Sequence, residues 1–197
     1  MKRNLIAMAV LALAATFAPV RARTRDIAFG FRMGAGFPGD VNRTHPASIP
    51  PGLMNTTNPV RLYGDPVIID TATNSYRGAI AGDTAVTKIA GILVRPYPTQ
   101  QSSGGMASAI GAAVPPTSGV VDVIEEGYVI ARCNNFGTLQ PTKGGAVFMR
   151  IAATAGALIQ GGLTSAADAA NTVQITNARW NGPTDANGIT ELQVWVQ

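Results

Sequence analysis

Few residues of this 197-residue chain have the types and spacing that chemistry requires. Its single histidine, His45, excludes any mechanism that needs a histidine pair, and no G-x-S-x-G elbow presents a serine nucleophile to it. Its single cysteine, Cys133, excludes an intrachain disulfide and a cysteine-built zinc site. We expect Cys133 to be a small buried apolar residue beside a strand. These counts favour a structural or binding protein over an enzyme.

Three short motifs resemble parts of ligand sites. Residues 34–39 match the dinucleotide fingerprint G-x-G-x-x-G, but prolines follow instead of the helix whose N-terminal amides would hold a pyrophosphate. Residues 185–188 resemble a fragment of a calcium loop and lack its remaining ligands, so a hairpin turn is expected. The neighbouring carboxylates of Glu125 and Glu126 would point to opposite faces of a strand. We therefore predict no catalytic, cofactor-binding or metal-binding residue.

Composition limits the class of protein further. Charged residues make up 13% of the chain, against roughly 25% in ordinary soluble domains. Much of the surface is therefore expected to be neutral or covered by other chains. The 22 glycines and 13 prolines argue against a helical bundle. Residues 1–43 carry a net charge of +5 and the remainder −1, which indicates a basic arm on a nearly neutral body. Because that body lacks a basic face interleaved with aromatic residues, no direct nucleic-acid binding is expected.

The apolar stretch from Leu5 to Val20 follows two basic residues and has two interpretations. One is a secretory signal peptide cleaved after Ala22. The other is a retained arm, helical from about Asn4 to Ala18, that must pack against a partner because it is apolar on every side. A membrane span is not expected, since the stretch is short for a hydrocarbon core of about 30 Å.

The rest of the chain predicts strands and turns. We expect residues 1–58 to form the arm and an extended connector, and residues 59–197 to form a mainly β domain, a small antiparallel barrel or sandwich, with a flexible loop at 100–119. One short helix is predicted at 163–170, a tight connection or bulge at Glu126-Gly127, and core positions for Trp180 and Trp195. The predicted strands cover residues 60–63, 67–70, 77–81, 89–96, 120–125, 128–133, 146–152, 157–160, 172–180 and 189–196.

Four of these segments carry a resemblance to a known family. Residues 64–70 read GDPVIID, residues 76–81 read YRGAIA, residues 89–96 read IAGILVRP and residues 120–128 read VVDVIEEGY. The pattern resembles the capsid cement, or decoration, proteins of tailed bacteriophages. The apolar N-terminus and the 100–119 segment depart from the pattern of that family.

The resemblance implies a structural virion protein without cofactor. Such proteins are compact β domains that bind the outer surface of the major capsid protein lattice, associate with neighbouring copies as dimers or trimers, and stabilise the head against internal DNA pressure. It implies assembly in the host cytoplasm and no membrane partner. The alternative is a secreted or periplasmic bacterial β domain that acts as a binding module. For the capsid function we expect the arm to supply the partner-binding side chains, namely Leu5, Ile6, Met8, Leu11, Leu13, Phe17, Arg21, Arg23, Arg25 and Arg32.

Overall fold

The computed structural model describes residues 36–41, 43, 47–96 and 114–195. The chain divides into two units, residues 1–32 and residues 33–197, and everything below belongs to the second. Within the described residues, the one helix is a three-residue 3-10 turn at Ala169–Asn171, and no helix is long and apolar enough to cross a membrane.

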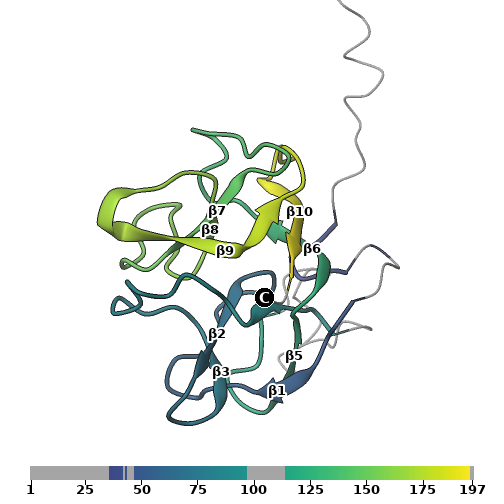
Figure 1. Cartoon of the computed structure of the whole chain (residues 1–197), viewed down its shortest axis with the longest axis vertical. Coiled ribbons are helices and arrows are strands. Elements are labelled where there is room, and N and C mark those ends of the chain that lie inside the picture. Colours follow the sequence, from purple (N-terminus) through teal and green to yellow (C-terminus); the bar gives the residue numbers. More distant parts are fainter. Residues whose placement is uncertain (1–35, 42, 44–46, 97–113, 196–197) are drawn as a thin grey trace, which may run out of the picture. The chain divides into compact units, whose positions relative to one another are not determined.

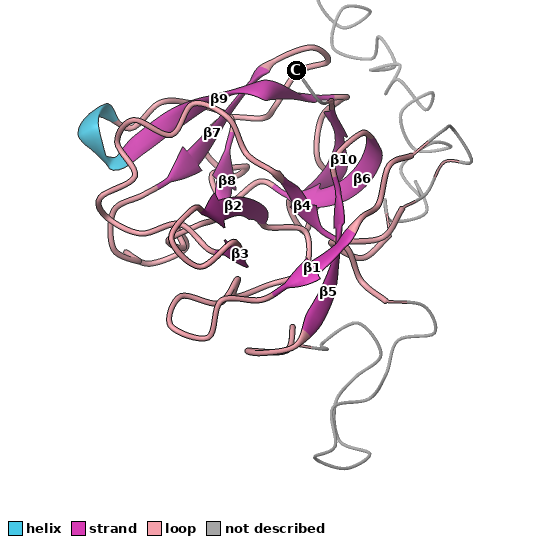
Figure 2. Ribbon diagram, turned by 60° about the horizontal axis from the view of Figure 1, so that its bottom comes forward, coloured by secondary structure: helices cyan, strands magenta, loops and turns pink. Residues whose placement is uncertain are grey.

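Ten strands form two five-stranded antiparallel sheets, which are visible as separate groups of arrows in Figure 1. Figure 2 shows the same strands from a second direction, with loops making up most of the remaining chain. The mainly β prediction is therefore confirmed. The first sheet has the order β1-β5-β4-β2-β3 and the second the order β6-β10-β9-β7-β8. The bounds are β1 Pro51–Leu53, β2 Pro66–Asp70, β3 Ser75–Arg77, β4 Gly91–Leu93, β5 Val120–Ile124, β6 Gly127–Arg132, β7 Ala146–Arg150, β8 Leu163–Thr164, β9 Thr172–Trp180 and β10 Ile189–Val194.

Each sheet curls until its two edge strands meet. In the first sheet, Met54 directly after β1 forms a parallel bridge with Tyr76 of β3, and the Asn55 N–H donates to the Tyr76 carbonyl over 2.7 Å. In the second, Cys133 directly after β6 bridges Leu163 of β8. This closure satisfies backbone groups that an open edge would leave exposed for pairing with another chain.

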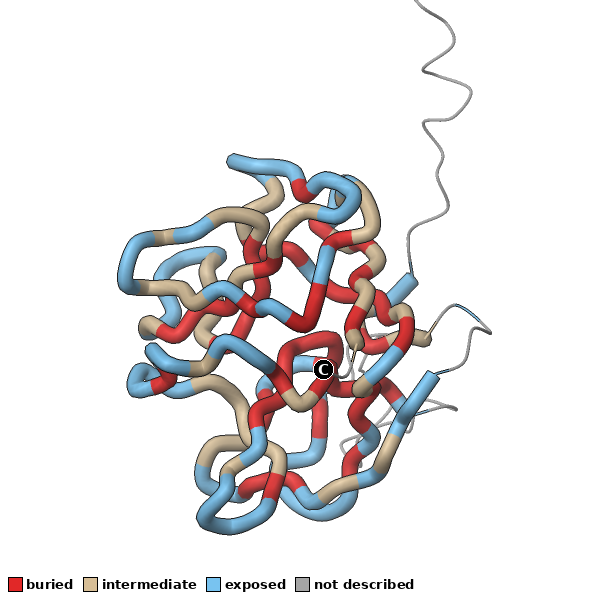
Figure 3. Tube along the Cα trace, in the orientation of Figure 1, coloured by how far each residue is buried: buried red, intermediate tan, exposed pale blue. Residues whose placement is uncertain are grey.

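Residues of the first sheet alternate between two apolar cores. Val67, Leu93 and Val123 point into the curl of their own sheet and pack there with Met54, Tyr63 and Val121. Their neighbours Ile68, Ile92 and Ile124 point outward into a larger core shared with the second sheet. Figure 3 shows buried residues along the strands of both sheets. Strands buried on both faces explain why these segments read as continuous apolar runs instead of alternating patterns.

A bulge in β9 joins the two sheets through hydrogen bonds. The register of β9 against β7 shifts between Ala146 and Val147, which places extra residues of β9 toward the first sheet. There the buried side chain of Asn177 accepts from the Ile89 N–H over 3.1 Å and donates to the Ile89 carbonyl over 2.9 Å. Ile89 lies just before β4, and the Asn177 amide supplies both hydrogen bonds that a neighbouring strand would otherwise make to its backbone.

The segment from Gly36 to Arg43 also touches both sheets. The Gly39 N–H donates to the Ile130 carbonyl of β6 over 2.8 Å, and the Gly39 carbonyl accepts from the Arg95 N–H over 2.9 Å. Further on, the Arg43 guanidinium makes two 2.6 Å hydrogen bonds to the Glu191 carboxylate of β10. The described part of the expected connector is therefore packed against the domain, and its residues 51–53 are strand β1.

The predicted tight connection at Glu126-Gly127 is confirmed, since only two residues separate β5 from β6, but it joins two sheets instead of two paired strands. Strands β5 and β6 belong to different sheets, and Glu126 bridges Ser48 instead. Gly127 has a φ of 135°, a conformation that glycine adopts readily, and the chain changes sheets there.

Three local predictions are wrong. The helix predicted at 163–170 is replaced by β8 and the 3-10 turn, because β8 pairs with β7 through Leu163 and Thr164. Residues 60–63 and 157–160 form no named strand. In these short segments tertiary pairing decides the structure more strongly than local propensity.

Candidate functional site

The ten side chains expected to bind a partner all lie outside the described residues, so their role stays a prediction. His45 lies outside them as well. Cys133 is fully buried, as predicted, and burial raises the pKa of its thiol, which opposes thiolate chemistry. Within the described segments, no group of three or more His, Cys, Asp or Glu side chains could hold a metal ion.

The motif at 185–188 is a turn, as predicted. The Asp185 carboxylate accepts from the N–H groups of Asn187 and Ile189 over 2.8 and 2.9 Å, and Gly188 has a φ of 79°. Trp180 occupies the core, as predicted, with 1% of its surface exposed. Trp195 is half-buried under the Arg179 guanidinium, whose carbon lies 5.8 Å from the ring centre.

Exposed apolar side chains gather on the outer side of β1 and β5. Leu53 is paired directly with Val120, and these side chains are 59% and 67% exposed. Pro51 and Ile49 precede Leu53 at alternate positions, so they share its side of the strand, and both are exposed. We call Ile49, Pro51, Leu53 and Val120 the β1–β5 apolar face. The exposed Asp122 lies opposite Pro51 on the same side, and exposed apolar side chains grouped in this way are typical of a binding site for another protein.

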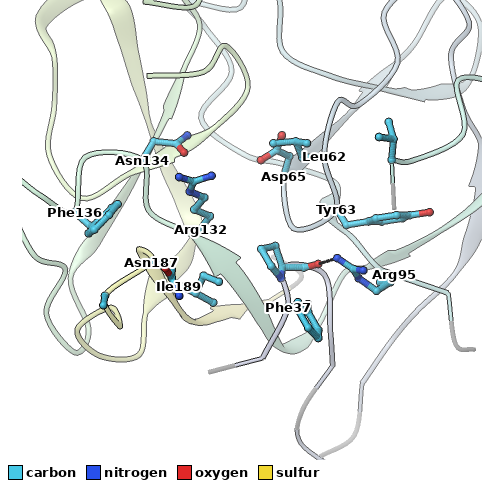
Figure 4. A pocket seen from close by; sticks show the side chains of 13 residues that line it. Phe37, Leu62, Tyr63, Asp65, Arg95, Arg132, Asn134, Phe136, Asn187 and Ile189 are labelled. Atoms are coloured by element: carbon cyan, nitrogen blue, oxygen red, sulfur yellow. Dashed lines mark hydrogen bonds between the residues drawn. The ribbon is translucent and has the colours of Figure 1, made fainter. Parts of the chain in front are cut away.

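A cavity of about 500 Å³ lies between the two sheets. Leu62, Tyr63 and Asp65 form its wall on the first sheet, and β6 with the residues after it supplies Arg132, Asn134 and Phe136 on the second (Figure 4). The loop before β10 adds Asn187 and Ile189, and Phe37 and Arg95 lie at another side. The cavity thus combines an apolar lining with a few polar groups, as binding sites commonly do.

Asp65 is the unusual residue of this cavity. It is only 9% exposed, yet none of the four salt bridges found among the described residues includes it. Burial raises the pKa of its carboxyl to about 8, and a hydrogen bond from the Leu62 backbone and the charges of Arg132 and Arg61 offset this only in part. The carboxyl is therefore mostly neutral at pH 7.

We expect Asp65→Asn to stabilise the protein at alkaline pH. The unfolded carboxyl has a pKa of about 3.9, so the folded state binds the proton more tightly than the unfolded state does. Its contribution to stability is fully present below pH 4 and is lost as pH rises to about 8. The melting temperature of the wild type should decline over that interval more than that of the variant. Asp122→Asn, at an exposed position, is the matched control; equal pH profiles for the wild type and Asp65→Asn would contradict the prediction.

The sequence analysis predicted neither the β1–β5 apolar face nor the cavity with Asp65, although the sequence contains a signal for the cavity. Asp65 is a single acid placed between a glycine and the apolar run 66–69, where an unpaired charge is unexpected. Leu53 and Val120 are 67 residues apart in the chain, and only the antiparallel pairing of β1 with β5 brings them together.

Two curled antiparallel sheets packed on a shared core define a mainly β domain. The comparisons with known proteins specify its family. The model of the XM1 gp53 minor capsid protein family matches residues 27–194, and the chain belongs to that family. It is thus a phage minor capsid protein, a structural component of the virion.

A solved structure has the same fold. A chain from the capsid of the Myoviridae phage XM1 superposes with a TM-score of 0.53 and 16% identity, and the alignment covers 84% of this chain and 93% of that chain. No curated protein matches. The strand motifs indicated a phage capsid protein, and the family match confirms this.

Proposed function

We propose that this minor capsid protein is a cement protein: it binds the outer surface of the major capsid protein lattice and holds neighbouring subunits together against the pressure of packaged DNA. The observation that carries this proposal is the β1–β5 apolar face. Burying a leucine or valine side chain stabilises a contact by roughly 1.5–3 kcal/mol, so a few such side chains on many copies sum to a strong attachment. Assembly in the host cytoplasm and association with neighbouring copies, as a dimer or trimer, are part of the same proposal.

Family membership favours this function over the secreted binding module. The retained arm with its ten partner-binding side chains stays a prediction and would add to the attachment by draping over adjacent subunits. The apolar face tests the proposal independently of the arm, because it belongs to the described domain.

Changing Leu53 and Val120 together to lysine should lower attachment to capsids by at least tenfold. Lysine would place two charges where apolar side chains are expected to become buried, and a charge taken out of water without a partner is costly. Purified heads that lack this protein would be mixed with increasing amounts of each variant, and the bound fraction measured by sedimentation. The folded domain should tolerate the change, since both side chains are more than half exposed.

Ile69→Lys is the matched control. Ile69 is a 47% exposed apolar residue on β2 of the same sheet, outside the β1–β5 apolar face. It should bind heads as the wild type does. If the double variant binds as tightly as this control, the apolar face is not the attachment surface. If bound protein fails to protect heads from rupture by osmotic shock, the cement function is contradicted.

A further inference from the structure

The cavity between the sheets has polar side chains on two opposite walls. In Figure 4 the Arg132 guanidinium and the Asp65 carboxyl lie on opposite walls of the cavity, with open space between these two groups. Asn134 lies beside Arg132. Arg132 stands at the end of β6, opposite Ile189 of β10. The carboxyl of Asp65, more than nine-tenths buried, is aimed into this space. Because burial raises its pKa to about 8, this carboxyl is mostly protonated at neutral pH and has an O–H group that a ligand in the cavity could accept from.

The charges around the cavity favour an anion. The charged groups that act on the Asp65 carboxyl are Arg132 at the end of β6 and Arg61 from the loop before β2. Both carry a positive charge, whereas Arg95 at the far side of the cavity is paired with Asp40 over 3.6 Å. Burial raises the pKa of Tyr63, so its hydroxyl stays neutral. An entering carboxylate would accept from Asp65 and from Arg132, the latter by a charge-assisted bond.

The apolar lining defines what must accompany the anion. Leu62 lies next to Asp65, and Phe136 and Ile189 lie on the side of Arg132 (Figure 4). These three side chains are partly exposed in the isolated chain. A ligand that covers them gains from burying apolar area on both partners.

We propose that this cavity binds a carboxylate next to an apolar side chain, supplied by an acidic residue of a neighbouring capsid protein chain, with Asp65 and Arg132 as the hydrogen-bond donors. The source of the carboxylate rests on the proposed function, whereas the chemistry of the cavity does not. The site would add charge-based specificity to an attachment that the β1–β5 apolar face provides through apolar area.

A pair of blocked dipeptides tests the chemistry on the full chain without any capsid. N-acetyl-Leu-Glu-amide should bind at least tenfold more tightly than N-acetyl-Leu-Gln-amide, which has the same shape without the charge. Binding would be measured by titration with NMR detection, and the shifted signals should come from Asp65, Arg132 and their neighbours. Equal affinities, or shifts confined to another surface, would overturn the proposal.

Two variants assign the donors. Arg132→Gln, at an exposed position, should weaken binding of the glutamate peptide by about tenfold, because the charge-assisted hydrogen bond from the guanidinium would be lost. In the wild type the affinity should fall about tenfold from pH 6.5 to pH 9 as Asp65 loses its proton and repels the ligand. Asp65→Asn should bind as the wild type does at pH 6.5 and lose this pH dependence. Unchanged binding by Arg132→Gln, or the same decline in Asp65→Asn, would contradict the assignment.

The source of the carboxylate is tested with the capsid sedimentation assay. Arg132→Gln should lower attachment to heads, while the Leu53/Val120 double variant should keep wild-type affinity for the glutamate dipeptide. Dipeptide binding together with undiminished attachment of Arg132→Gln to heads would overturn the assignment to a capsid chain and leave the cement function intact. If the Leu53/Val120 double variant loses attachment and Arg132→Gln does not, the apolar face attaches the protein to the capsid and the cavity does not contribute.

Discussion

Gly91→Ala should lower the free energy of unfolding by about 3 kcal/mol and the melting temperature by roughly 6–12 °C. Gly91 begins β4, where the backbone of β5 passes unusually close. A β-carbon at this position would lie 2.3 Å from the Ile124 carbonyl oxygen and 2.7 Å from a methyl carbon of Val123. Since the carbonyl is part of the sheet and cannot rotate away, the two strands would have to separate, and both apolar cores would lose packing.

Gly82→Ala is the matched control for Gly91→Ala. A β-carbon at Gly82 would meet nothing within 4 Å, and this glycine does not have a positive φ. Its replacement should leave the melting temperature unchanged or raise it slightly, because alanine restricts the unfolded chain. Thermal unfolding followed by circular dichroism measures both variants. A Gly91→Ala protein as stable as Gly82→Ala would show that β4 and β5 tolerate a wider spacing than the structure has.

Asn177→Ala should destabilise the protein by about 3–4 kcal/mol, because the Ile89 N–H and carbonyl would both lose their partner in a buried position. Each unsatisfied buried group costs about 1–3 kcal/mol. The Asn177 amide makes the hydrogen bonds to Ile89 in the β9 bulge, and both residues are buried, with 5% and 4% of their surface exposed. Denaturant unfolding would give the change in free energy, and the slope of the transition would report whether the two sheets still unfold together.

Thr176→Val separates this effect from a general weakening of the bulge. The Thr176 hydroxyl donates to the Thr87 carbonyl over 3.0 Å, at the same junction but on the exposed side. Water can replace that hydrogen bond, so the cost should stay below about 1 kcal/mol. Equal effects of the two substitutions would refute the role assigned to the buried amide.

Much of the fold could be predicted from the sequence because its strands are apolar, β-branched and bounded by turn residues. Residues 67–70, 120–125, 146–152 and 172–180 were assigned as strands, and β2, β5, β7 and β9 occupy them to within two residues at either end. The burial of Cys133 and the turn at 185–188 follow from equally local signals. So does family membership, since the segments 64–70 and 89–96 keep a recognisable pattern.

The division into two sheets depended on the tertiary structure. The connection from β5 to β6 is so short that a hairpin is the expected local structure, yet Glu126 pairs with Ser48, 78 residues earlier. No local pattern predicts that the chain changes sheets here, because the change depends on burying Ile124 and Val129 in a core that both sheets build. The short strands β3 and β8 were likewise unpredictable, since pairing alone defines them.

The sequence by itself determined a mainly β, low-charge chain, because alternation, turn residues and composition act locally or over the whole chain. Its strand motifs also carried the resemblance to phage capsid proteins. Only the tertiary structure decided which side chains form surfaces. Strand pairing places Leu53 and Val120 on one apolar face. Asp65 and Arg132 line the same cavity only because the two sheets pack together. The physical reason is distance along the chain. Each of these sites joins segments about 67 residues apart, which come together only through the packing of the whole domain and not through any local sequence pattern.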